Sequence, residues 1–206
     1  MKLLLHTCCA PCLIQCAEAL AEEGIKPDLF WYNPNIHPLT EYRSRLEALT
    51  SFLGGAFAEE KKLSLIGEDN YGLRFFLSET FPFIEVPGEN SGKKKDSRCH
   101  LCYKMRLEKT AALAAEKGYQ AFSTTLLISP FQNHEQISRL GRDLASGHNS
   151  DSPADSPAKS PLEFFYRDFR PRFRESQRQA RALGFYMQKY CGCIFSEEER
   201  WPERNK

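Results

Sequence analysis

The chain has 206 residues, of which 41% are hydrophobic, so it is long enough to bury one sizeable core. We therefore expect a single domain that spans residues 1–206. The formal net charge of +1 excludes a globally basic nucleic-acid coat. We expect no DNA partner, although a local basic patch is compatible with this charge.

The first residues look superficially like a lipoprotein signal, because Lys2 and three leucines precede Cys8. His6 and Thr7 interrupt this apolar stretch, whereas cleavable signals carry about 7–15 apolar residues. No other run approaches the roughly 20 apolar residues that span a bilayer. We expect a soluble, cytoplasmic protein without a membrane partner.

The first half of the chain alternates strand and helix patterns. Short apolar or aromatic runs predict strands over Lys2–Thr7 and Asp28–Tyr32. Helical periodicity predicts helices over Pro11–Glu23 and Glu41–Leu53, each followed by glycine. This order of strands and helices predicts an α/β domain with a parallel sheet.

Further along, helical patterns cover Tyr71–Thr80, Cys99–Lys117 and Asn133–Ala145. Aromatic and β-branched residues predict a strand over Gln120–Leu127. The stretch Gly147–Pro161 has almost nothing apolar to bury, so we expect a mobile insertion there, without chemistry.

The eight cysteines fall into three groups that are far apart in the sequence. In a reducing cytosol, cysteines are more often metal ligands or redox catalysts than structural disulfides. Scattered core cysteines would not group in this way. The groups are Cys8, Cys9, Cys12 and Cys16; Cys99 and Cys102; and Cys191 and Cys193.

The first group lies where the first predicted strand gives way to the first helix. Ligands bind at the carboxyl ends of strands in open α/β sheets, and a helix N-terminus stabilises thiolates. Cys8, Cys9 and Cys12 are therefore candidate ligands. The alternative is that small cysteines fill the core, and this is the favoured interpretation of Cys16.

The second group is a Cys-x-x-Cys motif, Cys99 to Cys102, which we expect at the start of a helix. Arg98 adds positive charge that favours thiolates. With the cysteine loop of the first group, the motif supplies the usual four thiolates of an iron–sulfur cluster. Four thiolates also make a structural zinc site, and the sequence leaves both open.

In the third group, Gly192 separates Cys191 from Cys193 and permits a tight backbone. Such spacing suits an easily reduced disulfide, so a redox-active pair is one interpretation. The other is that one or both thiolates hold a second metal.

Arginines and aromatic residues alternate before the third group. Guanidinium groups can hold phosphates, and aromatic rings can stack on bases that leave an RNA helix. An aromatic core face with a solvated arginine face gives the same pattern. The candidate RNA-binding residues are Arg167, Arg170, Arg172 and Arg174.

Taken together, six motifs resemble the cobalamin-independent epoxyqueuosine reductases over nearly the whole chain. They are Leu4-Leu5-His6-Thr7-Cys8-Cys9-Ala10-Pro11-Cys12, Tyr32-Asn33-Pro34-Asn35-Ile36-His37-Pro38, Arg98-Cys99-His100-Leu101-Cys102, Ser123-Thr124-Thr125-Leu126-Leu127-Ile128-Ser129-Pro130, Asp168-Phe169-Arg170 and Tyr190-Cys191-Gly192-Cys193-Ile194-Phe195-Ser196.

The resemblance implies a HUP-like (Rossmann-like) parallel sheet flanked by helices, with a helical and loop-rich C-terminal portion. It implies reduction of epoxyqueuosine to queuosine at the anticodon wobble position of tRNA. By the same resemblance, a [4Fe-4S] cluster is held by Cys8, Cys9, Cys99 and Cys102. Cys191 and Cys193 would be a redox-active pair, and Cys12 is a candidate ligand of an adjacent mononuclear iron.

Conversion of an epoxide to an alkene takes two electrons and releases the oxygen as water. It needs an electron relay, a Lewis acid, a proton source and an external electron donor. Candidate proton donors by residue type are Asp96, His100, His134 and Asp168. Asp168 is favoured because it lies within the arginine and aromatic segment. A zinc-stabilised tRNA-binding module and a metal-free thiol–disulfide oxidoreductase remain alternatives.

Overall fold

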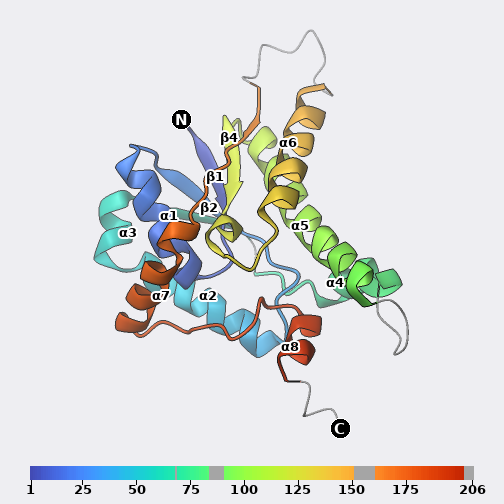
Figure 1. Cartoon of the computed structure of the whole chain (residues 1–206). Helices are drawn as coiled ribbons and strands as arrows, with labels where there is room; N and C mark the ends of the chain where they lie inside the picture. The colour runs from blue at the N-terminus through green and yellow to red at the C-terminus, as the bar shows by residue number, and fades with distance from the viewer. Residues whose placement is uncertain (68, 84–90, 151–160, 202–206) are drawn as a thin grey trace.

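The computed structural model describes residues 1–67, 69–83, 91–150 and 161–201 (Figure 1). Its centre is one parallel sheet of five strands in the order β3-β2-β1-β4-β5. The strands are β1 (Leu3–His6), β2 (Pro27–Trp31), β3 (Ser64–Gly67), β4 (Ala121–Thr124) and β5 (Glu163–Phe164). The prediction of an α/β fold with a parallel sheet is confirmed.

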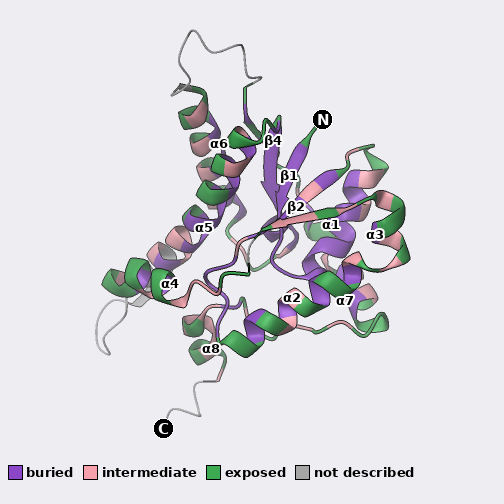
Figure 2. Ribbon diagram, turned by 180° about the vertical axis from the view of Figure 1, so that it is seen from behind, coloured by how far each residue is buried: buried purple, intermediate pink, exposed green. Residues whose placement is uncertain are grey.

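The two central strands form the middle of the core. Every residue of β1 and β4 is buried, and Leu3 pairs with Ala121 at the start of their register. A parallel strand that is covered on both faces is apolar along its whole length. This is why Leu3-Leu4-Leu5 forms a strand although apolar and polar residues do not alternate in it. Figure 2 shows this buried centre between partly exposed helices.

Helices cover both faces of the sheet. In Figures 1 and 2, α1 and α7 lie on one side of it, and α5 and α6 lie on the other. The helices are α1 (Ala10–Glu22), α2 (Leu39–Leu53), α3 (Ala56–Lys61), α4 (Leu73–Thr80), α5 (Ser91–Glu116), α6 (His134–Ser150), α7 (Phe173–Ala182) and α8 (Ile194–Arg200). No helix in the described part of the chain combines the length and apolar character needed to cross a membrane.

Two predicted boundaries are wrong. The helix that carries Cys99 begins at Ser91, because a lysine-rich stretch without apolar periodicity still forms its first turns. Cys99 therefore lies inside α5 and not at its start. The strand predicted over Gln120–Leu127 ends at Thr124, where the chain turns into a 3-10 helix (Thr125–Ile128).

The predicted insertion is also shorter at its N-terminal side. Helix α6 continues to Ser150, so Gly147 is helical, while residues 151–160 lie outside the described part. The side chain of Asn149 bonds both backbone polar groups of Leu162, with N–O distances of 2.9 and 3.1 Å. This contact connects the end of α6 to the approach of β5.

The sequence patterns did not predict α3, β3, β5, α7 or α8. Strands β3 and β5 have only four and two residues, too short for a periodicity to emerge. Helix α7 falls in the arginine-rich segment, where strand-like alternation was equally plausible. It packs against α1, since the hydroxyl of Ser176 donates to the carbonyl of Pro11 at 2.6 Å.

Candidate metal and redox site

The chain order of the sheet reverses between β1 and β4, so their carboxyl ends open a crevice. His6 is the last residue of β1 and is fully buried. Its Nε2 is 3.1 Å from the carbonyl of Tyr32, and its Nδ1 is 2.9 Å from the hydroxyl of Thr124. Because a carbonyl only accepts, Nε2 carries the proton. Burial lowers the pKa of His6 to about 4, so the ring is neutral and structural.

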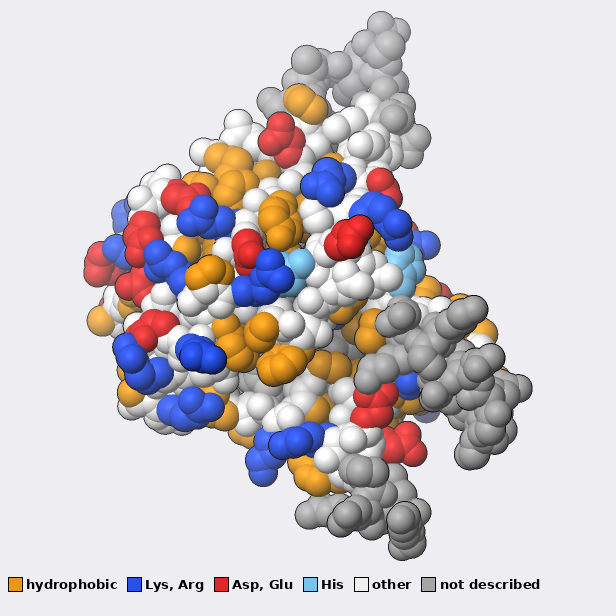
Figure 3. All heavy atoms as spheres, viewed as in Figure 1, with side chains coloured by type: hydrophobic (Ala, Val, Ile, Leu, Met, Phe, Trp, Pro, Cys, Tyr) orange, Lys and Arg blue, Asp and Glu red, His pale blue; other side chains and the backbone are white. Residues whose placement is uncertain are grey.

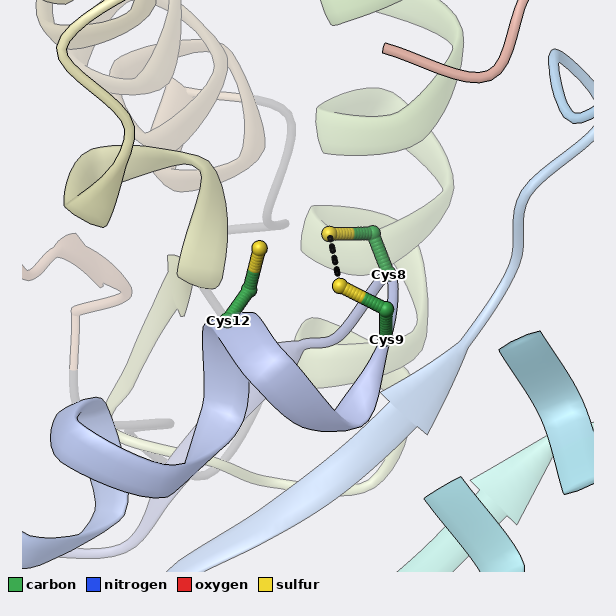
Figure 4. Close-up of side chains that lie close together, drawn as sticks. All are labelled: Cys8, Cys9 and Cys12. Atoms are coloured by element: carbon green, nitrogen blue, oxygen red, sulfur yellow. Dashed lines mark hydrogen bonds between the residues drawn. The ribbon is translucent and has the colours of Figure 1, made fainter. Parts of the chain in front are cut away.

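Three cysteines come together where β1 gives way to α1. Cys8 and Cys9 follow β1, and Cys12 lies in the first turn of α1, for which Cys9 is the N-cap residue. The ligand atoms of the three thiols all lie within 4.8 Å of one another, and all three residues are buried. Figure 4 shows the sulfurs pointing into one shared space.

This spacing fits thiolate ligation of a metal. The Sγ atoms of Cys8 and Cys9 are 3.8 Å apart. In a tetrahedral site with metal–sulfur bonds of about 2.3 Å, two sulfur ligands lie about as far apart as the sulfurs of Cys8 and Cys9 do here. Hydrogen bonds from Cys12 and Cys9 hold the pKa of Cys8 well below its usual value, while the pKa of Cys12 is raised. Cys16 lies in the core outside the group, as predicted.

The other cysteine pairs line an adjoining cavity of about 210 Å³. Cys99 and Cys102 enter it from α5, and Cys191 and Cys193 enter it from the segment before α8. A second cavity, of about 460 Å³, is lined by Cys8, Cys12 and again Cys191. Six of the eight cysteines thus line one or both of these neighbouring cavities, and a seventh, Cys9, belongs to the buried group with Cys8 and Cys12.

Cys191 and Cys193 have unequal surroundings. Their sulfurs are 3.8 Å apart, and the Sγ of Cys191 lies 2.9 Å from the hydroxyl of Ser196. The hydrogen bond with Cys193 is the main cause that lowers the pKa of Cys191 to about 5, while the pKa of Cys193 is raised. Cys191 is also the exposed member of the pair. The reduced pair is therefore one accessible thiolate beside one thiol.

Two buried arginines, missed by the sequence analysis, face the sulfurs. Arg106 is 4% exposed, and its guanidinium donates to the sulfur of Cys102 at 3.1 Å and to the carbonyl of the same residue at 2.9 Å. No carboxylate pairs with it in the described part of the chain. A buried cation needs a compensating anion, so Arg106 favours ionised or metal-bound thiols nearby. In the sequence, only the i,i+4 spacing of Arg106 from Cys102 on a predicted helix could have indicated this contact.

Arg45, the second arginine, is 2% exposed and reaches across to the Cys191 segment. It donates to the carbonyls of Tyr190 and Cys191 at 3.0 and 3.2 Å, and its Nε donates to Glu41 at 2.7 Å. Gln188, also missed, donates to the sulfur of Cys9 at 3.2 Å. Nothing in their sequence neighbourhood marks Arg45 or Gln188 as contacts of a distant cysteine.

The predicted RNA-binding arginines lie in and before α7, and three of them have carboxylate partners. Arg167 pairs with Glu23 at 2.8 Å, Arg170 pairs with Asp168 at 2.6 Å, and Arg172 pairs with Glu22. Arg174 is exposed. Figure 3 shows basic and acidic side chains intermingled around α1, α3 and α7, without a continuous basic field.

Asp168 accepts hydrogen bonds from Arg170 and does not face the cysteine cavities. Oδ1 of Asp168 accepts from the backbone and Nε of Arg170, at 3.0 and 2.8 Å, and this lowers the pKa of Asp168 to about 2. It lines neither of the two cysteine cavities. Of the other candidates, His134 lies in the same cluster, 3.4 Å from the hydroxyl of Tyr166. The side chain of Asp96 lies outside the described part.

Fold and site together define a class: a Rossmann-like α/β protein with a buried three-thiol group, able to bind metal, beside a close pair of thiols. Comparison with known sequences narrows this class. The model of the family described as epoxyqueuosine reductase QueH matches residues 3–199, and the chain belongs to this family.

Individual relatives agree with the family match. The epoxyqueuosine reductase QueH of Dehalococcoides mccartyi is 37% identical over 99% of this chain and 97% of its own length. The protein of the same name from Acinetobacter baylyi is 35% identical, over 97% of this chain and 83% of its own. That of Thermotoga maritima is 32% identical, over 96% and 91% respectively.

Proposed function

We propose that this chain is an oxidoreductase that reduces epoxyqueuosine to queuosine at the anticodon wobble position of tRNA. The observation that carries the proposal is the family match over residues 3–199, which includes all eight cysteines. The activity named for the relatives requires groups that deliver two electrons and a group that binds the epoxide oxygen as it leaves. The cysteine arrangement is of a kind that can provide both.

The dithiol has the right stoichiometry. Deoxygenation of an epoxide consumes two electrons and two protons, breaks both C–O bonds, and yields an alkene and water. Oxidation of Cys191 and Cys193 to a disulfide releases two electrons and one proton, because Cys191 starts as a thiolate and Cys193 as a thiol. Water supplies the second proton. One dithiol thus supplies the electrons for one epoxide, and an external electron donor must reduce the disulfide before the next turnover. The 3.8 Å separation of the two sulfurs is compatible with this role.

A [4Fe-4S] cluster fits the donor set, which is all thiol and faces buried cations. We propose Cys8, Cys9, Cys99 and Cys102 as its ligands and Cys12 as a ligand of an adjacent iron. The close approach of Cys12 to Cys8 and Cys9 supports a metal ligand role for all three. When bound, the group would supply electron transfer and a Lewis-acidic iron for the epoxide oxygen. Arg106 and Arg45 would stabilise the negative charge of the thiolates.

One of the two protons is better supplied by the cysteine pair than by Asp168. A carboxyl group with a pKa of about 2 is ionised at neutral pH and has no proton to give. Cys193 keeps its proton because its pKa is raised, and it lines the smaller cavity. Its thiol is therefore the proton source that we favour.

Metal and sulfide analysis of anaerobically purified variants tests this assignment. We expect the wild-type protein to contain iron and acid-labile sulfide, and Cys102→Ala to lose both, since no nearby side chain replaces the thiolate. Cys12→Ala should lose a fraction of the iron and keep its sulfide. The matched control is Cys16→Ala, one helical turn away in the core, which should keep all of its metal.

Other outcomes separate the alternatives. Zinc without sulfide would indicate a zinc-stabilised module, and a protein without metal would indicate a thiol–disulfide oxidoreductase. Full iron and sulfide in Cys102→Ala would show that the ligand assignment is wrong.

A further inference from the structure

Phe131 is unusually exposed for its position. It is 83% exposed, more than any other large hydrophobic residue in the described part of the chain. Yet it lines both cysteine cavities, so it stands on the rim between them. A single exposed apolar residue is common on protein surfaces, but an aromatic ring at the mouth of a reactive site is placed to contact whatever enters it.

The ring is presented by an ordered turn after the 3-10 helix that follows β4. The backbone N–H of Phe131 donates to the hydroxyl of Ser129 at 3.3 Å, and Gln132 donates to the carbonyl of Ser129 at 3.4 Å. Phe173, at the start of α7, forms a T-shaped pair with Phe131, with ring centroids 6.1 Å apart and planes at 85°. Because Phe131 is still 83% exposed, its ring remains accessible to a planar partner.

Two exposed cations lie on the wall of the larger cavity. Lys189 and Arg200 both line it and both are exposed. Neither pairs with a carboxylate in the part of the chain that the structure describes. This separates them from Arg167, Arg170 and Arg172, whose guanidinium groups are already matched by acidic residues.

We propose that Phe131, Lys189 and Arg200 form the RNA-contacting rim of this site: Phe131 stacks on an unpaired base of the anticodon loop, and the two cations hold loop phosphates. The inference rests on the proposed function, which makes tRNA the substrate. Proteins commonly hold single-stranded RNA by aromatic stacking and by phosphate contacts, and here residues suited to both line a cavity with the thiols. The larger cavity, of about 460 Å³, falls within the size range of small-molecule sites, so it can accept one extruded nucleoside.

Binding of the metal-loaded protein to an anticodon stem-loop RNA that carries epoxyqueuosine tests the stacking contact. A fully paired hairpin of similar length is the reference probe. Phe131→Ala should weaken stem-loop binding on the order of 10-fold and leave the salt dependence unchanged, because stacking releases no counterions. Phe131→Trp should bind, and its indole fluorescence should be quenched by the stacked base. Phe81→Ala is the matched control, since Phe81 is 71% exposed and lines neither cavity.

The cations are tested through salt dependence. The double variant Lys189→Ala, Arg200→Ala should reduce the slope of log K against log salt by roughly 1.4, about 0.7 for each phosphate contact. The pair Arg170→Ala, Arg172→Ala should leave the slope near that of the wild-type protein. Equal affinities for Phe131→Ala and Phe81→Ala would overturn the stacking contact. A slope lost only with Arg170 and Arg172 would overturn the phosphate contacts.

The failure of the proposed function has a different signature. A wild-type protein that binds the stem-loop no better than the paired hairpin, and converts no epoxyqueuosine, contradicts the tRNA substrate itself. Conversion by the wild-type protein, with Phe131→Ala unchanged in both affinity and KM, contradicts only the rim.

Discussion

At the scale of single residues, Arg45 explains how the Cys191 segment is held. Its guanidinium group bonds two consecutive carbonyls of that segment and the carboxylate of Glu41. Gly192 has φ +116°, and a Cβ there would lie 3.1 Å from Nη1 of Arg45. The backbone between the two cysteines is therefore fitted to this arginine, which also contributes positive charge that lowers the pKa of Cys191.

Alkylation of Cys191 by iodoacetamide should report this effect. Because the pKa of Cys191 is lowered to about 5, its rate should stay high at neutral pH and fall as the pH drops through about 5. The double variant Glu41→Gln, Arg45→Met removes the positive charge without leaving the carboxylate buried alone. Its midpoint should move to higher pH, whereas Arg45→Lys should stay nearer the wild-type value. An unchanged midpoint in the double variant would contradict the role of Arg45.

The role of Cys193 can be separated from metal binding. Cys193→Ala should keep its iron and sulfide and still bind tRNA, yet lose multiple-turnover conversion, because a single thiol cannot form the disulfide. Nucleoside analysis and metal analysis of the same sample are both needed. Loss of iron without loss of sulfide would instead make Cys193 a ligand of an adjacent iron. Full turnover with unchanged metal would leave the pair without either role.

At the scale of elements, close packing of α6 on β5 depends on one glycine. A Cβ on Gly141 would lie 2.3 Å from the ring of Phe164, which itself packs on Phe122 of β4. The helix can approach the edge strand only without a side chain at this position. The short β5 is thus held in the sheet by α6 as much as by its own pairing with β4.

Two alanine variants of this helix should shift stability in opposite directions. Gly141→Ala should lower the free energy of unfolding by roughly 1–3 kcal/mol, because the ring or the helix must move. Gly147→Ala has nothing within 4 Å of the new Cβ, and it should raise stability by up to about 1 kcal/mol through helix propensity. Thermal unfolding of both variants checks this. Equal melting temperatures would mean that Phe164 yields freely.

At the scale of the whole molecule, strong local signals predicted most of the sheet and its first helices. The apolar run before Cys8 and the glycine after α1 located β1 and α1 to within a residue or two. The start of α5 was missed because its first turns have no apolar residues in the sequence, so there was no helical periodicity to read there. Strands of two or four residues likewise carry too few positions for a period.

The site was predictable in its cysteines but not in their surroundings. Grouped thiols stand out in a sequence, whereas Arg45, Arg106 and Gln188 gain their meaning only from contacts across the fold. The same holds for the tail. The RNA-binding role of the arginines stays a prediction, but the structure adds that Arg170 pairs with Asp168 and Arg172 with Glu22. Glu22 lies 150 residues from Arg172, so that pairing could not be read from local spacing.

The most direct test of the central claim is mass spectrometry of nucleosides from epoxyqueuosine-containing tRNA after anaerobic incubation with the iron-loaded protein and a reductant. The account predicts loss of epoxyqueuosine and an equal gain of queuosine, lighter by one oxygen atom. It also predicts that Cys193→Ala gives no multiple turnover under the same conditions. Unconverted epoxyqueuosine, with a wild-type protein that holds its full iron and sulfide and binds the tRNA, would contradict it.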